Sequence, residues 1–152
     1  MKRAAASLVF LLAIGLIGAG AQAVAIGFGV GYETSGLILV SALAETLINR
    51  SIDLRAQVGF ATSSIAGLML VTMDLLGHWA IPPLDPYIGL GIGAALTPPP
   101  FSTGVIAEGI AGMRVPAPNV VQLFLQVRYL VRWSSVGWNA GPVFEGGFLA
   151  RF

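Results

Sequence analysis

Four stretches of this chain alternate between large apolar residues and residues that are small or polar. The alternating stretches are residues 24–33, 51–61, 87–96 and 119–133. In the last of them Val127 and Tyr129 share one parity, whereas Gln126 and Arg128 share the other. Successive side chains of a β-strand point to opposite faces, so a period of two predicts strands with one apolar and one polar face.

The composition by itself favours membrane-spanning helices. The chain is 56% hydrophobic and only 10% charged, whereas ordinary soluble domains are about 25% charged. A helix, however, would turn charges such as Asp53 and Arg55 toward lipid. Each of Gly89, Gly91 and Gly93 would also cost a helix about 1 kcal/mol relative to alanine. The pattern therefore predicts a membrane protein that crosses with strands.

Turn-forming residues divide the chain after residue 23 into eight segments. The predicted turns are 33–36, 49–50, 62–64, 81–86, 97–100, 116–119 and 134–135. The segments between them are long enough to cross a bilayer when tilted, which takes about 9 to 11 residues. Residues 37–48 and 66–79 are nearly continuous apolar runs, but reading them as helices would leave open sheet edges in lipid. We therefore predict an all-β fold, an eight-stranded antiparallel up-and-down transmembrane β-barrel.

The first 23 residues have the features of a secretory signal peptide. Lys2 and Arg3 precede an apolar stretch, which ends in the small-x-small sequence Ala21-Gln22-Ala23. An uncleaved helical anchor is the alternative, although the apolar stretch is shorter than the ~20 residues that a helical span needs. We expect cleavage after Ala23, a signal peptide over residues 1–23 and a single barrel domain over residues 24–152.

The end of the chain resembles the small bacterial outer-membrane β-barrels of the OmpA and OmpX type. Phe148, Ala150 and Phe152 share one parity and finish on an aromatic residue, and residues 86–93 and 126–129 also resemble strand segments of that family. The resemblance implies a bacterial outer-membrane location with lipid around the barrel. It also implies that these three residues are the assembly signal read by the barrel-insertion machinery, although Phe152 alone is open to a second interpretation as an interface aromatic.

Nearly every charge of the mature chain falls on the parity opposite to the apolar face. We therefore expect a lumen network in which acids and arginines neutralise one another. The alternatives for this set are a proton or ion path and a binding site. Its predicted members are Glu33, Glu45, Asp53, Arg55, Asp74, Glu108, Arg114, Arg128, Arg132, Glu145 and Arg151.

Large aromatic residues lie near the ends of several predicted strands. Amphipathic rings suit the headgroup zone of a membrane, so these residues are expected to anchor the barrel at the two interfaces. The predicted anchors are Trp79, Phe101, Trp133 and Trp138. The predicted segment 136–152, which contains Trp138, is expected to start irregularly because it also contains Pro142.

The sequence offers little chemistry for catalysis, metals or nucleic acid. There is no cysteine, and the only histidine is His78. An even number of strands puts both chain ends at one rim, which is expected to be periplasmic as in bacterial outer-membrane barrels. His78 precedes a turn at this rim, which is the wrong end for chemistry on outer-leaflet lipid. Without Lys2 and Arg3 the count is six basic against seven acidic residues, a net charge of −1. We therefore predict no catalytic, cofactor-binding or metal-binding residue and no nucleic-acid partner.

Taken as a whole, the residues predict a structural outer-membrane barrel with a side-chain-packed lumen that contributes to envelope integrity. Eight strands leave just enough interior space for side chains to fill. A narrow pore for ions or small solutes, a lipid-modifying enzyme and a surface-binding module stay open as alternatives. The residues leave the oligomeric state open.

Overall fold

The computed structural model describes residues 24–62, 67–79, 81–97, 103–117, 120–135 and 137–152. The expected signal peptide and Phe101 lie outside the described residues. Within these ranges, no helix is long and apolar enough to cross a membrane. The strands are β1 (Val24–Glu33), β2 (Ile38–Asn49), β3 (Ile52–Thr62), β4 (Gly67–His78), β5 (Asp85–Leu96), β6 (Thr103–Pro116), β7 (Val121–Ser134) and β8 (Gly137–Arg151).

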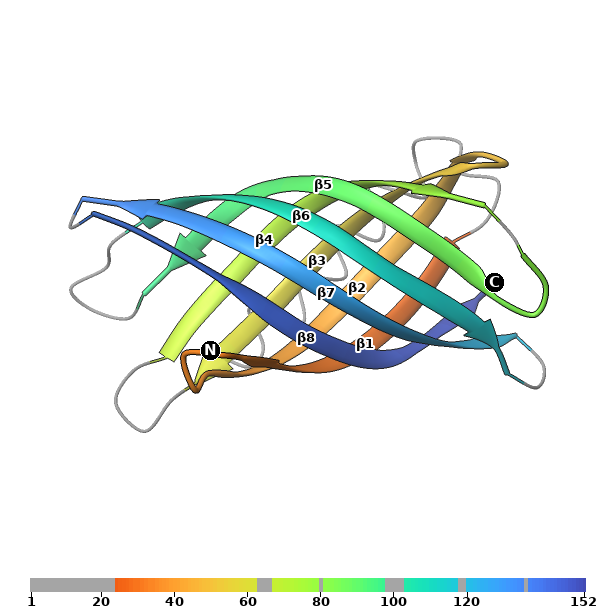
Figure 1. The fold of residues 1–152 in the computed structure, drawn as a ribbon, viewed down its shortest axis with the longest axis horizontal. Coiled ribbons are helices and arrows are strands. Elements are labelled where there is room, and N and C mark those ends of the chain that lie inside the picture. Colours follow the sequence, from red (N-terminus) through yellow and green to blue (C-terminus); the bar gives the residue numbers. More distant parts are fainter. Residues whose placement is uncertain (1–23, 63–66, 80, 98–102, 118–119, 136) are drawn as a thin grey trace.

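Each strand pairs antiparallel with its neighbour in the sequence, and β8 pairs with β1, which closes the barrel (Figure 1). The closing seam runs from the pair Ala25 and Arg151 to the pair Glu33 and Val143. The predicted fold class, an eight-stranded up-and-down barrel, is confirmed. We call the end where β1 begins and β8 finishes the terminal end, and the opposite end the distal end.

The two nearly continuous apolar runs are confirmed as strands β2 and β4. Their inward parity carries leucines, among them Leu39 and Leu43 on β2 and Leu70 and Leu76 on β4, each of which is at most 4% exposed. Both faces of these strands therefore carry apolar residues, because parts of the inward face contact the packed interior and the other face points outward. Where the lumen-facing residue is apolar, the sequence lacks the alternation of apolar and polar residues that identifies the other strands.

Two proline-containing segments are more regular than the sequence suggests. The predicted turn at 81–86 is shorter, because Asp85 and Pro86 already pair with Arg114 and Met113 as the start of β5. Strand β8 also continues through Pro142, although the sequence predicts an irregular start. The β1–β8 ladder ends at Val143, one residue before the proline is reached. Pro142 takes part only through its carbonyl, which accepts a hydrogen bond from the Thr34 N–H, so the N–H that proline lacks is not needed for pairing with β1.

The outward parity forms an apolar surface around the barrel. Representative exposed fractions are 60% for Val30, 74% for Leu90, 71% for Ile92 and 63% for Leu125. Soluble proteins rarely expose apolar patches of this extent, and such patches mark surfaces that contact lipid or another protein. The outer face is therefore suited to a lipid environment.

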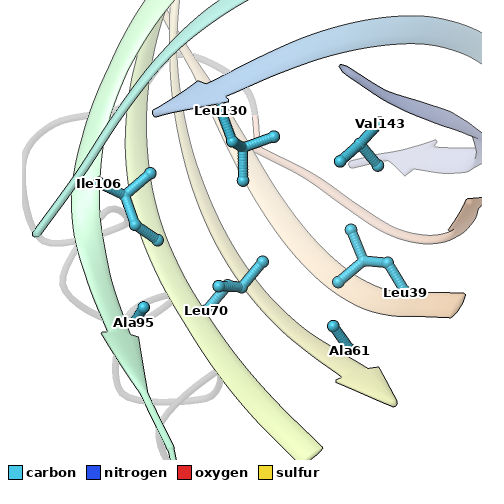
Figure 2. Packing of buried hydrophobic residues seen from close by; sticks show 7 residues of the cluster. All are labelled: Leu39, Ala61, Leu70, Ala95, Ile106, Leu130 and Val143. Carbon is cyan, nitrogen blue, oxygen red and sulfur yellow. The ribbon is translucent and has the colours of Figure 1, made fainter. Parts of the chain in front are cut away.

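A ring of apolar side chains fills the lumen toward the distal end. It draws one residue from every strand except β1, and each is at most 6% exposed. The side chains converge on the barrel axis in Figure 2. We call this ring the lumen seal; its members are Leu39, Ala61, Leu70, Ala95, Ile106, Leu130 and Val143.

Candidate functional site

The candidate site is the charged interior of the barrel on the terminal side of the lumen seal. The strand period turns the predicted network residues inward, and most are buried in the structure. Side chains at most 5% exposed are Glu33, Glu45, Asp53, Arg55, Asp74, Glu108, Arg114, Arg128 and Glu145. Arg132 and Arg151 are half-buried. Burial of this many charges requires close pairing, because an isolated charge away from water is strongly unfavourable.

The first group of interactions is centred on Arg128 of β7. Its guanidinium donates to both oxygens of Glu108, from Nε to Oε2 at 2.6 Å and from Nη2 to Oε1 at 2.8 Å. Nη1 donates to Glu145 Oε2 at 3.3 Å, and Nη2 also reaches Thr72 Oγ1 at 3.3 Å. Arg128 therefore holds β4, β6 and β8 together across the lumen.

Glu145 of β8 is the most extensively bound carboxylate of this group. In addition to Arg128, it accepts from Gln57 Nε2 at 2.9 and 3.2 Å and from Gln126 Nε2 at 2.8 Å. The hydroxyl of Ser41 donates to it as well. Donors from β2, β3 and β7 thus compensate the negative charge that Glu145 brings into the lumen.

A second group lies closer to the terminal end and contains two arginines. Arg55 donates from Nε and Nη2 to Glu45 Oε2 at 2.9 and 2.7 Å, and Arg114 Nη2 donates to the same oxygen at 3.1 Å. Arg114 Nη1 is 2.9 Å from Asp53 Oδ2. The Glu45 carboxylate therefore bridges two guanidinium groups that would otherwise repel each other, and Asp53 supplies Arg114 with a second negative charge.

The ring of Tyr87 lies against both arginines of this group, and the ring of Phe124 lies against Arg55. The Tyr87 ring centroid is 5.3 Å from Arg55 Cζ and 4.8 Å from Arg114 Cζ, and the Phe124 centroid is 5.8 Å from Arg55 Cζ. The Tyr87 hydroxyl donates to Gln126 Oε1 at 2.8 Å, an oxygen that also accepts from Arg55 Nη1 at 2.6 Å. These aromatic faces stabilise the buried cations by cation–π contact and exclude water from them.

His78 lies at the terminal rim between two carboxylates. Its Nδ1 is 3.1 Å from Asp85 Oδ1, and its Nε2 is 3.8 Å from Asp53 Oδ1. Asp85 Oδ2 also accepts from Arg114 Nη1 at 3.2 Å. The histidine is thus joined to the second group, and no cluster of three or more His, Asp or Glu among the described residues is arranged to hold a metal ion.

The third group lies beyond the lumen seal at the distal end, where Arg132 Nη2 donates to Glu33 Oε1. Arg132 also lines a cavity of about 290 Å³ at this mouth of the barrel, together with Leu68, Ala95 and Asn139. The seal thus separates this outer ion pair from the two interior groups.

Two predicted network residues form no direct ion pair with another described residue. Arg151 is half-buried at the terminal end. Asp74 is completely buried, and neither of its carboxyl oxygens accepts a hydrogen bond. Ser41, Thr72 and Asp85 take part without having been predicted; the first two share the inward parity, which is the signal that could have identified them.

The predicted anchors and assembly residues lie on the outer face. Trp79 follows β4 at the terminal end and is 49% exposed. Trp133 and Trp138 pair directly across β7 and β8 at the distal end and are 47% and 72% exposed. The rings of Phe148 and Phe28 lie tilted against each other, with centroids 6.0 Å apart. Ala150 pairs with Ile26 and Val121, and Phe152 N–H donates to the Val24 carbonyl at 2.9 Å.

No family model matches this sequence, and no curated protein matches it. Solved structures do share the fold. The N-terminal β-barrel domain of Pseudomonas aeruginosa OprF aligns with a TM-score of 0.72 at 13% identity, over 87% of this chain and 98% of that one. Neisserial surface protein A aligns at 0.66 with 14% identity, over 86% and 95%.

The outer-membrane enzyme PagL shares the architecture as well, with a TM-score of 0.56 and 11% identity over 84% of this chain and 98% of PagL. At these identities the likeness shows the fold, since catalytic and binding residues are properties of the site and not of the fold. The chain therefore has the fold of the small bacterial outer-membrane barrels, which confirms the resemblance seen in its sequence.

Proposed function

We propose that this protein is a structural barrel of the bacterial outer membrane, with a closed lumen, and that it contributes to the integrity of the envelope. The apolar outer face and the shared fold support the location. The observation that carries the closed lumen is the combination of the lumen seal with the ion groups on its terminal side. Leu39, Ile106 and Leu130 in the seal are at most 1% exposed. Arg55 and Arg128, on the terminal side of the seal, are also at most 1% exposed.

A barrel filled in this way opposes ion flow for two reasons. A hydrated ion would have to displace the seal side chains, which are packed against one another and offer no hydrogen-bonding groups. It would then meet arginines and acids already bound to each other, so a passing ion would have to break a buried ion pair. Both barriers lie in series along the same axis.

Single-channel recording in planar bilayers tests the closed lumen. Purified protein that has been shown to be folded by its faster gel migration without boiling is expected to give no steady openings. A variant with the seal residues Leu39 and Leu130 both changed to serine serves as the matched control, since polar groups in the seal should admit water and raise the leak. Steady ion-selective openings of the wild-type protein would support the narrow-pore alternative and contradict the proposal.

A deletion strain tests the contribution to the envelope. Cells without the gene are expected to take up more of a hydrophobic dye that the intact outer membrane excludes, and the wild-type gene should restore exclusion. The Leu39→Ser/Leu130→Ser gene, expressed at the same level, should restore it less well. Unchanged dye uptake in the deletion strain would contradict a role in envelope integrity.

A further inference from the structure

Asp74 differs from every other acid of the barrel interior. Glu45, Glu108 and Glu145 each accept hydrogen bonds from at least one arginine, and Asp53 lies 2.9 Å from Arg114 Nη1. Asp74 is equally buried, at 0% exposed. Within the described residues it forms no ion pair, and both Oδ1 and Oδ2 lack a hydrogen-bond donor.

The register places Asp74 beside a second carboxyl group. Asp74 of β4 pairs with Gly91 of β5, and Gly91 pairs with Glu108 of β6. All three residues face the lumen, and the glycine supplies no side chain between the two acids. A methyl carbon built on Gly91 would lie 2.9 Å from Glu108 Cγ and 3.1 Å from Asp74 Cγ. The carboxyl group of Asp74 and the side chain of Glu108 therefore share the space above Gly91.

The neighbouring cations are already committed to other acids. Arg128 of β7 uses Nε and Nη2 on Glu108 and Nη1 on Glu145, and Arg55 of β3 binds Glu45 and Gln126. Arg55 pairs with Asp74 in the β3–β4 ladder, but its guanidinium hydrogen-bonds to Glu45 and Gln126 and not to Asp74. The central group thus places Asp74, Glu108 and Glu145 around one arginine that hydrogen-bonds to acids of this group, Arg128. Glu108 and Glu145 are each hydrogen-bonded to Arg128, so the excess negative charge falls on Asp74.

An ionised Asp74 would be a buried anion next to another carboxylate, with no donor to compensate either its lost hydration or the repulsion. A neutral Asp74 removes the repulsion and gains an O–H group. Glu108 is a suitable acceptor, because a carboxylate oxygen can accept more than one hydrogen bond. Arg128 donates only one hydrogen bond to each oxygen of Glu108, so either oxygen can accept another.

We propose that Asp74 and Glu108 form a proton-binding site, in which Asp74 is the neutral acid and donates its proton to the Glu108 carboxylate. One proton is then a fixed component of the folded lumen, alongside the arginines. This inference goes beyond the proposed function and holds whether or not the barrel conducts ions.

Infrared spectroscopy of the folded barrel at neutral pH tests the proposal directly, because the C=O stretch of a carboxylic acid is separate from the carboxylate stretches. The wild-type protein is expected to show this band. Aspartate labelled with ¹³C at its side-chain carboxyl should shift the band, whereas labelled glutamate should not. Absence of the band, or a shift only with labelled glutamate, would overturn the assignment to Asp74.

The variant Asp74→Asn provides the second measurement, since its amide has the shape of the neutral acid and can donate to Glu108. This variant should fold and show no acid band. The urea midpoint of the wild-type protein is expected to change in mildly alkaline buffer, whereas that of Asp74→Asn should not. Glu33→Gln, in the outer ion pair, is the matched control and should retain the band. A band that persists in Asp74→Asn would contradict the proposal, and should this variant fail to fold, the labelling result on the wild-type protein decides.

Discussion

Arg128 on β7 binds Glu108 on β6 through two hydrogen bonds, 2.6 Å from Nε to Oε2 and 2.8 Å from Nη2 to Oε1. The two residues are not opposite each other in the ladder, because Glu108 pairs with Leu130 and Arg128 with Ile110. The ion pair therefore runs diagonally across two strands inside the barrel. It is the bidentate, charge-assisted type, which is the stronger kind of hydrogen-bonded pair.

Replacing Arg128 with alanine should lower the free energy of unfolding by about 3 kcal/mol, because removal of one partner leaves a buried carboxylate without compensation. Urea unfolding in detergent measures the loss. Arg132→Ala is the comparison on the same strand: Arg132 binds the single carboxylate Glu33 and lines the cavity at the distal mouth, whereas Arg128 binds two carboxylates, so the loss for Arg132 should be smaller. Equal losses for the two variants would show that the Arg128 pair is solvated.

The lumen seal should be sensitive to lost volume. Leu130→Ala is expected to cost about 2–5 kcal/mol of unfolding free energy, because it removes apolar contacts and leaves a cavity that its neighbours cannot fill. Leu125→Ala, on the outer face of the same strand, should cost less, since lipid chains can occupy the vacated space. Thermal and urea unfolding in the same lipid or detergent would measure both. A larger loss for Leu125 would contradict the packing of the seal.

Substitution by alanine should impair folding at Gly27 but not at Gly109. At Gly27 an added carbon would meet the Phe148 carbonyl oxygen of the neighbouring strand and lie 2.7 Å from Leu43 Cδ1. At Gly109 nothing lies within 4 Å of the added carbon. We expect Gly27→Ala to reduce the folded fraction on unboiled gels and Gly109→Ala to leave it unchanged. Normal folding of both variants would show that β1 and β8 can move apart at little cost.

The assembly role of the chain end stays a prediction. Deleting Phe152 should lower the amount of inserted barrel more than Trp133→Phe does, because the terminal aromatic is the feature that the insertion machinery would read. Quantitative blots of outer-membrane fractions would compare the two. If both variants reach the same membrane level, Phe152 is an interface aromatic like the others.

The start of the mature chain is a prediction as well. The small-x-small sequence Ala21-Gln22-Ala23 places the expected cleavage after Ala23. N-terminal sequencing of the protein from membranes should therefore find Val24 first. Retention of Met1 would contradict the signal peptide and favour an uncleaved anchor.

The sequence by itself was sufficient for the number of strands and for the direction of most side chains. A strand alternates its side chains regardless of what surrounds it, so the inward position of Arg55 or Arg128 follows from local geometry alone. The turn residues then divide the chain, and the absence of tolerated open edges in lipid requires closure. Where the alternation was hidden, as in β2 and β4, length and closure still identified the strands.

Only the tertiary structure decided which inward residues meet. Arg55 contacts Gln126, which is 71 residues away, and Ser41 contacts Glu145, which is 104 residues away. Such pairs depend on the stagger of all eight strands around the closed barrel, a quantity that no single strand encodes. For the same reason the apolar inward residues gather into a seal, and Asp74 faces Glu108 across Gly91 without an arginine of its own.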